Sequence, residues 1–312
     1  MKMLNIRAVS LSGLGVLITA ALALSGCTAT TPSTRAATVA DLGHVHGFAL
    51  NPATKQTFVA AHRGIWRFDS GYLTGAKTTK QPKRVGNGSQ DTMGLTIDGS
   101  GQMFASGHPD PKNNPRNDPE DLGLITSKDN ANTWKTVSLN GKADFHDIVA
   151  VAEAGNPEAQ RIYGYDASSQ TLRVSTDSGR NWDDGATLAL RKLAVNDAVP
   201  STVYATTKAG LQVSYDAGAH FTPVPGAPSL YLIDAINTNP GHFVGVDVNN
   251  IIWTTNDGGI TWTQEGQFAS APEAIHVVAD GSRTRLLGVD KRGIVATPDY
   301  GKTWAVLLPG KP

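Results

Sequence analysis

Histidines are concentrated in the first half of the chain, beside short apolar segments that could bring their side chains together. Imidazole binds transition metals and changes charge near neutral pH, so grouped histidines predict a metal or ligand site. Imidazole with a thioether suits copper, and imidazole with a carboxylate suits zinc, iron or nickel. The predicted ligand-binding set is His44, His46, His62, Met93, His108, His146 and Asp166. Within that set, the predicted ligands of a copper or zinc ion are His46, His62, His108 and His146.

A sequence repeat marks the elements that would position these side chains. Five copies of the pattern Ser/Thr-x-Asp-x-Gly-x-x-Trp occur with small deviations, and their aspartates are 48, 39, 41 and 42 residues apart. Asp bonds local backbone amides and Gly tolerates positive φ, so each copy predicts a hairpin turn. The aromatic residue would then begin the next strand and bury its ring. The structural aspartates of the five turns are Asp129, Asp177, Asp216, Asp257 and Asp299.

This motif resembles the Asp-box, or BNR, repeat of sialidases, sortilin-type receptors and related bacterial β-propellers. In those families the motif is structural and joins the third and fourth strands of a propeller blade. Here an apolar run and two β-rich segments precede each copy, in units that begin near residues 43, 91, 144, 190, 229 and 272. We therefore expect an all-β, six-bladed β-propeller. Seven blades and an open β-solenoid are the alternatives.

Propeller geometry converts a position in the repeat into a position in space. The first strand of each blade starts at the rim where the second strand ends, and the Asp-box turns lie at the opposite rim. The predicted ligand-binding set falls at these strand ends in the first three blades, so we expect it around one sector of the channel mouth. The alternative is a polar channel lined by His and Asp without a metal. An insertion at 108–121 lies on the same rim and could cover the mouth.

Three classes of function remain open. The segments HVHG at 44–47, GHPDP at 107–111 and DFH at 144–146 resemble a family of bacterial lipoproteins often labelled glycosyl hydrolase-like. We favour a binding module for a small ligand, a glycan or a metal at the channel over an enzyme. The enzyme alternative is a sialidase-like glycoside hydrolase, which needs two carboxylates about 5–10 Å apart. Its candidates are Asp166 and Asp290, but the Arg-Ile-Pro motif of sialidases is absent.

The third class is an envelope assembly or interaction scaffold. Asp-box propellers that assist photosystem II assembly resemble this repeat layout, but they use a basic surface patch. Here the basic residues are scattered, and the only local cluster lies at 77–84.

The first residues have the form of an export signal. MKMLNIR carries two cations and precedes an apolar run. LSGC at 24–27 resembles the lipobox of bacterial lipoproteins, in which the cysteine is lipidated and becomes the new N-terminus. We expect a signal peptide at 1–26, lipidated Cys27 with a flexible linker at 27–42, and the propeller at 43–312. The membrane would then be a partner, and the protein would be anchored outside the cytoplasm. A secretory signal followed by a free cysteine is the alternative.

Composition excludes several classes of protein. Lys+Arg and Asp+Glu both number 27, so no overall charge favours nucleic acid as a partner. The single cysteine excludes a disulfide framework and a multi-cysteine zinc or iron–sulfur site. With 40% hydrophobic residues, the chain is not a disordered charged polymer. We expect a folded monomer.

Overall fold

The computed structural model describes residues 36–69, 82–86, 88–110, 112, 114, 118–237, 239–280 and 283–310. The expected signal peptide, Cys27 and part of the insertion at 108–121 lie outside the described residues. Among the residues that are described, no helix combines the length and the apolar character needed to cross a lipid bilayer.

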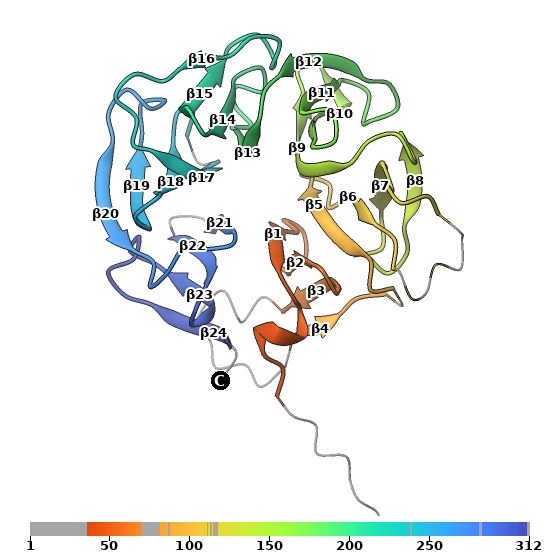
Figure 1. Ribbon diagram of the computed structural model, residues 1–312, viewed down its shortest axis with the longest axis horizontal. Coiled ribbons are helices and arrows are strands. Elements are labelled where there is room, and N and C mark those ends of the chain that lie inside the picture. The colour runs from red at the N-terminus through yellow and green to blue at the C-terminus, as the bar shows by residue number, and fades with distance from the viewer. Residues whose placement is uncertain are drawn as a thin grey trace, which may run out of the picture. The chain divides into compact units, whose positions relative to one another are not determined.

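Six four-stranded antiparallel sheets surround a central channel, which confirms the six-bladed β-propeller (Figure 1). In every blade the strands follow their sequence order from the channel outward, because each strand pairs antiparallel with the next one in the sequence. The innermost strands begin at residues 45, 91, 145, 190, 230 and 275, close to the unit starts that the repeat predicted.

The strands of blade 1 are β1 (Val45–Leu50), β2 (Thr57–Ala61), β3 (Gly64–Phe68) and β4 (Lys83–Arg84). Those of blade 2 are β5 (Asp91–Ile97), β6 (Met103–His108), β7 (Leu124–Ser127) and β8 (Lys135–Ser138). Those of blade 3 are β9 (Phe145–Glu153), β10 (Asn156–Asp166), β11 (Thr171–Ser175) and β12 (Asp183–Thr187). Those of blade 4 are β13 (Leu190–Val195), β14 (Val203–Thr207), β15 (Gly210–Ser214) and β16 (Thr222–Pro223). Those of blade 5 are β17 (Leu230–Ala235), β18 (Phe243–Asp247), β19 (Ile251–Thr255) and β20 (Thr263–Gln267). Those of blade 6 are β21 (Ile275–Asp280), β22 (Arg283–Asp290), β23 (Gly293–Thr297) and β24 (Ala305–Pro309).

The hydrophobic core is divided among the interfaces between neighbouring blades. Phe58 of blade 1 and Ile125 of blade 2, for example, are fully buried in one shared cluster. The second strands β2 and β18 are buried at every position, because adjacent blades cover both of their faces. Their near-continuous apolar sequence is typical of strands buried on both sides.

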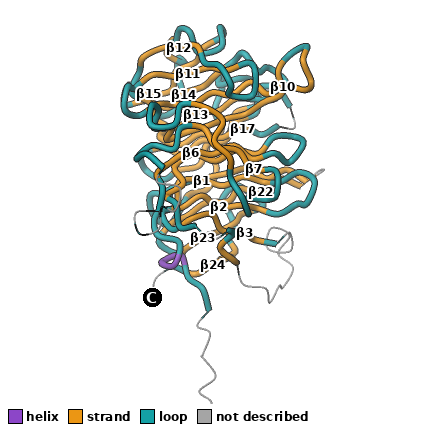
Figure 2. The backbone as a smooth tube through the Cα atoms, turned by 90° about the vertical axis from the view of Figure 1, so that its right-hand side faces the viewer, coloured by secondary structure: helices purple, strands orange, loops and turns teal. Residues whose placement is uncertain are grey.

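Blade 6 closes against blade 1 through side chains, and none of the described strands is shared between the two sheets. Glu273 Oε2 accepts a hydrogen bond of 2.8 Å from the Val45 N–H across this seam. The 3-10 helix η1 (Val39–Asp41) precedes the first strand and lies at the edge of the ring, near β23 and β24 (Figure 2). Leu42 is fully buried at the seam, so the compact unit begins at Ala36, within the linker that the sequence suggested.

The five predicted turn aspartates lie between the third and fourth strands of blades 2 to 6. One carboxylate oxygen of each accepts a hydrogen bond of 2.7–2.9 Å from the Ser or Thr hydroxyl two residues earlier. The same oxygen accepts one of 2.8–3.0 Å from the backbone N–H four residues later. The fifth residue of each turn has positive φ and is Gly in four turns, but in blade 2 it is Ala131. These carboxylates therefore hold their turns closed.

Candidate metal centre

A β-bulge in the innermost strand sets the direction of the side chains at the rim opposite the Asp turns. The bulged residue is His46 in β1, Met93 in β5 and His146 in β9. An extra residue bends a strand and re-aims its side chain out of the regular alternation. The innermost strands of blades 4 and 5 have the same irregularity at Arg191 and Tyr231. The same β-bulge therefore places a different type of side chain at the rim in each of five blades.

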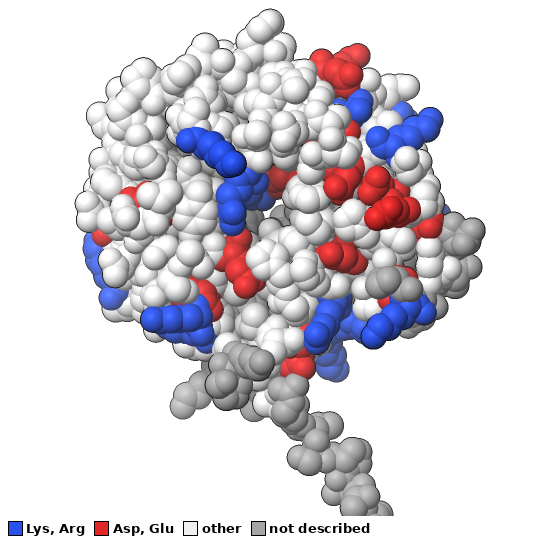
Figure 3. Space-filling view, viewed as in Figure 1, with Lys and Arg blue, Asp and Glu red and all other residues white. Residues whose placement is uncertain are grey.

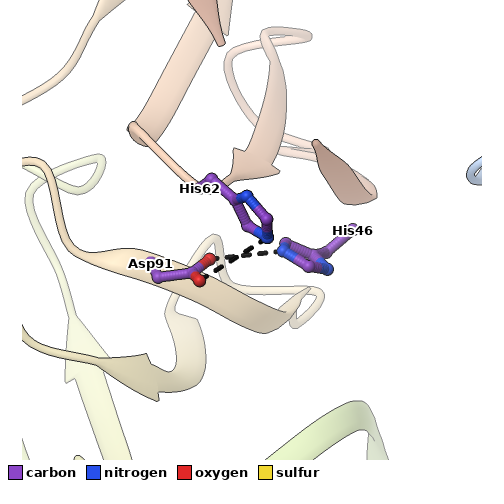
Figure 4. A group of neighbouring side chains, drawn as sticks. All are labelled: His46, His62 and Asp91. Carbon is purple, nitrogen blue, oxygen red and sulfur yellow. Dashed lines mark ion pairs between the residues drawn. The ribbon is translucent and has the colours of Figure 1, made fainter. Parts of the chain in front are cut away.

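Rim group 1 consists of His46, His62 and Asp91, and it bridges blades 1 and 2 (Figure 4). The Nε2 atom of His46 lies 3.2 Å from Asp91 Oδ1, and that of His62 lies 3.6 Å from Asp91 Oδ2. Both His46 Nε2 and Asp91 Oδ1 are buried, their mutual contact is poorly aligned for a hydrogen bond, and no other described residue supplies a partner for either atom. Because buried polar atoms in proteins are almost always paired, these two atoms need another explanation.

The ionisation of rim group 1 suits cation binding. Burial lowers the pKa of His46, and the attraction of Asp91 only partly offsets this effect. Burial alone would raise the pKa of Asp91, but the neighbouring imidazoles, His46 first, outweigh it and lower that pKa. A neutral imidazole therefore faces a carboxylate near neutral pH, and both are the forms that bind metals.

A third imidazole, His44, lies beside rim group 1. Its ring centroid is 4.9 Å from that of His46 and 5.4 Å from that of His62. Glu273 of blade 6 holds it, with Oε2 lying 3.3 Å from His44 Nδ1. His44 is thus close to the group but is turned toward the seam between the first and last blades.

Rim group 2 consists of His108, Asp144 and His146, and it bridges blades 2 and 3. His146 Nε2 lies 2.9 Å from Asp144 Oδ2, and His108 Nε2 lies 3.7 Å from Asp144 Oδ1. The hydrogen bond to Asp144 raises the pKa of His146, so a metal must displace a proton more often here than at rim group 1. Burial and the charge of Asp144 raise the pKa of the neighbouring Asp121.

The structure divides the four histidines predicted as one ligand set into two groups, each completed by a carboxylate. Sequence reasoning missed both carboxylates, Asp91 and Asp144. Each stands two residues before the bulge of its strand, where blade 1 carries His44. Alignment of these positions in the first three blades could have identified Asp91 and Asp144 from the sequence.

Met93 belongs to neither group and lines the channel instead. The channel encloses a cavity of about 720 Å³, and His46 and Met93 lie at its lining together with residues of every innermost strand. Deeper in the lining, Asp147 is paired with Lys192, and His276 is paired with Asp234 at 2.9 Å. His46 is therefore accessible to a ligand in this cavity.

The two candidate acids of a hydrolase are engaged within their own blades. Asp166 is 1% exposed and accepts hydrogen bonds from the hydroxyls of Ser168 and Ser169 and from Arg173 Nε. Asp290 is held by Arg292, whose Nη2 lies 2.6 Å from Oδ2. Among the described residues, neither carboxylate is part of the cavity lining.

The charges around the channel mouth are unevenly distributed. In the view down the channel, acidic side chains gather over β5 to β7 and β9, whereas basic side chains stand beside the channel near β13 and β17 (Figure 3). Asp91, Asp121 and Asp144 belong to the acidic side, and Arg191 and Lys192 belong to blade 4 on the other side. Both rim groups thus lie where the local field favours cations.

Comparison with known proteins extends the fold assignment. No protein-family model matches the sequence, and a search of curated proteins finds no match either. A gluconolactonase from Xanthomonas campestris is similar in structure, with a TM-score of 0.60, 10% identity, and coverage of 84% of this chain and 88% of that one. YCF48 bound to a D1 peptide has a TM-score of 0.51 and 14% identity, with coverage of 86% and 84%.

A GH74 xyloglucanase from Xanthomonas campestris is also similar, with a TM-score of 0.54, 16% identity and coverage of 85% of this chain. This chain spans only 45% of that enzyme and 36% of an ancestral GH74 enzyme. At these identities the likenesses show a shared propeller architecture.

Proposed function

We propose that this propeller is a metal-binding module, held outside the cytoplasm by a lipid on Cys27, and that rim group 1 binds a zinc ion. The observation that supports it best is the buried, unpaired contact between His46 Nε2 and Asp91 Oδ1. Ligand atoms about 2.1 Å from a tetrahedral zinc ion are about 3.4 Å apart. The two nitrogen–oxygen distances within the group, 3.2 and 3.6 Å, lie on either side of that separation.

The ligand chemistry favours zinc over copper. Two imidazoles and one carboxylate are the protein ligands of many zinc sites that leave a fourth position for water or a small ligand. A copper site with a thioether would need Met93, which lines the channel. Because His46 also lines the channel cavity, the fourth position would be accessible from that cavity.

Zinc titration by calorimetry, with metal analysis of protein purified without chelators, tests this proposal. The variant His62→Ala is suitable because the His62 side chain is 48% exposed and its loss disturbs little packing. We expect it to bind one zinc ion fewer per chain than the unaltered protein. His242→Ala, which changes a histidine outside both groups, is the matched control and should bind zinc normally. Equal zinc binding by the unaltered protein and His62→Ala would refute the proposal.

The two alternatives predicted from the sequence gain no specific support. A glycoside hydrolase would need carboxylates other than Asp166 and Asp290, because both accept several hydrogen bonds within their own blades. For an assembly scaffold, the similarity to YCF48 concerns the fold alone.

A further inference from the structure

We infer that the rim binds two divalent cations side by side, the second of them in rim group 2. This inference rests on the proposed function, because it makes the zinc ion of rim group 1 the neighbour of a second ion. It assigns His108, Asp144 and His146 as the ligands of that second ion.

The first argument is the orientation of His108. The backbone carbonyl of Glu120 lies 3.0 Å from His108 Nδ1, within hydrogen-bonding distance of a protonated Nδ1. A ring that donates from Nδ1 presents the lone pair of Nε2, and Nε2 lies 3.7 Å from Asp144 Oδ1. Metal-binding histidines are commonly fixed in this way, by a carbonyl or carboxylate that accepts the N–H of the other ring nitrogen.

The second argument is an unpaired carboxylate oxygen. Asp144 Oδ1 is buried, and like Asp91 Oδ1 in rim group 1 it has no hydrogen-bond partner among the described residues. Its distance to His108 Nε2, 3.7 Å, is too long for a hydrogen bond but close to the separation of two atoms that share one ion. The two groups therefore repeat one arrangement, two imidazoles around a carboxylate, at neighbouring blade boundaries.

The third argument is the connection between the two groups. Asp91 of rim group 1 and His108 of rim group 2 are directly opposite each other in the β5–β6 ladder. Residues in such positions have Cα atoms about 4.5–5.5 Å apart. Three carboxylates, Asp91, Asp121 and Asp144, surround this connection and offset the charge of two cations. The insertion that follows β6 supplies two of the groups that hold His108, Glu120 and Asp121.

The experiment is zinc titration of the purified full chain, with Co²⁺ as an absorbing probe of coordination geometry. We expect two ions per chain for the unaltered protein, one for His46→Ala/His62→Ala and one for His108→Ala/His146→Ala. Asp144→Asn keeps the shape of its side chain and should also bind one ion. If His108→Ala/His146→Ala does not fold, Asp144→Asn alone tests whether rim group 2 binds the second ion. His242→Ala is the control and should bind two.

The outcomes separate the two proposals. One ion in the unaltered protein that is lost only on altering rim group 1 would overturn the second site and leave the proposed function standing. One ion that is lost on altering either group would mean a single shared site, and would overturn the inference of two ions. No bound zinc at all would overturn both proposals.

Discussion

The Asp turns provide a prediction whose size follows from the structure. Gly179 occupies the fifth position of the blade 3 turn with φ 82, and Ala131 occupies the same position in blade 2 with φ 66. A Cβ atom added at Gly179 would overlap with Cδ2 of Leu124, which is fully buried in the neighbouring blade. The same turn therefore tolerates a methyl group in one blade and excludes it in the next.

We expect Gly179→Ala to destabilise the protein by about 1–4 kcal/mol, after subtracting about 0.4–1 kcal/mol for the lower freedom of Ala in the unfolded chain. Positive φ in a residue with a Cβ costs about 1–2 kcal/mol, and overpacking a rigid core costs about 1–3 kcal/mol. Ala131→Gly is the matched reverse change. Relief of about 1–2 kcal/mol of backbone strain is offset by the loss of a buried methyl group, about 0.8 kcal/mol, and by the greater freedom of Gly in the unfolded chain, about 0.4–1 kcal/mol. We therefore expect Ala131→Gly to change stability by less than about 1 kcal/mol.

Urea unfolding followed by tryptophan fluorescence measures both changes, since the free energy of unfolding varies linearly with denaturant concentration. The reasoning would be refuted if Gly179→Ala changed the free energy of unfolding by less than about 0.5 kcal/mol, the range of an ordinary surface substitution. A loss of stability in Ala131→Gly as large as that in Gly179→Ala would equally contradict it, because backbone strain would then be irrelevant at this position.

Three further predictions concern the metal site, acid stability and a contact between blades. Zinc at about one hundred times its Kd should raise the free energy of unfolding by about 2.7 kcal/mol and the Tm by about 5–10 °C. A chelator should reverse both changes. An unchanged Tm in a thermal melt would argue against zinc binding by rim group 1. Hydrogen bonds lower the pKa of Asp129, Asp257 and Asp299 to about 2, and the largest contributions come from the hydroxyl and then the N–H of the Thr four residues later. Since the pKa of a carboxyl in the unfolded chain is about 3.9, this stabilisation is fully present above about pH 4 and is lost as the pH falls through about 2. Thermal melts should therefore show a Tm that falls as the pH is lowered across this range. A Tm that does not change with pH would contradict the role of these carboxylates in stability. The Tyr163 hydroxyl of blade 3 donates a hydrogen bond of 2.7 Å to the Pro200 carbonyl of blade 4. Tyr163→Phe should therefore lower the free energy of unfolding in urea by about 1–3 kcal/mol. An unchanged free energy of unfolding would mean that water replaces this bond.

The fold could be predicted because its signals are local and repeated. Each Asp turn depends on residues no more than six positions apart, and five such turns at regular spacing mark the repeating units. The start of every blade was correct to within about three residues for the same reason, since an apolar run precedes each unit. Repeated short-range patterns of this kind require no knowledge of contacts between blades.

The site could be predicted only in part, because its geometry depends on contacts across blade boundaries. The sequence placed His46 and His108 on one rim, but it did not show that each would meet a carboxylate. Asp91 reaches back to blade 1, a contact that alignment of the repeats cannot reveal. His276 pairs with Leu287 within the β21–β22 ladder and lies in the channel lining beside Asp234, so it joins neither rim group.

Asp166 illustrates a different limit. The sequence placed it at the end of the second strand, which is correct, and from that position we expected it to face the channel mouth. The two serines that follow it form a turn that accommodates the carboxylate, and Arg173 from the next strand neutralises its charge. A carboxylate after a strand is therefore equally well explained as a cap of its own hairpin.

The seam between blades 6 and 1 has a consequence for how such a ring can change in evolution. Every backbone ladder is complete within one continuous stretch of about forty residues, so duplicating or deleting a stretch of that length would sever no sheet. Contacts between blades, such as that between Glu273 and Val45, would have to be rebuilt at the new junction. A relative with an added blade would keep both rim groups, since these lie within blades 1 to 3, far from an insertion in blades 4 to 6.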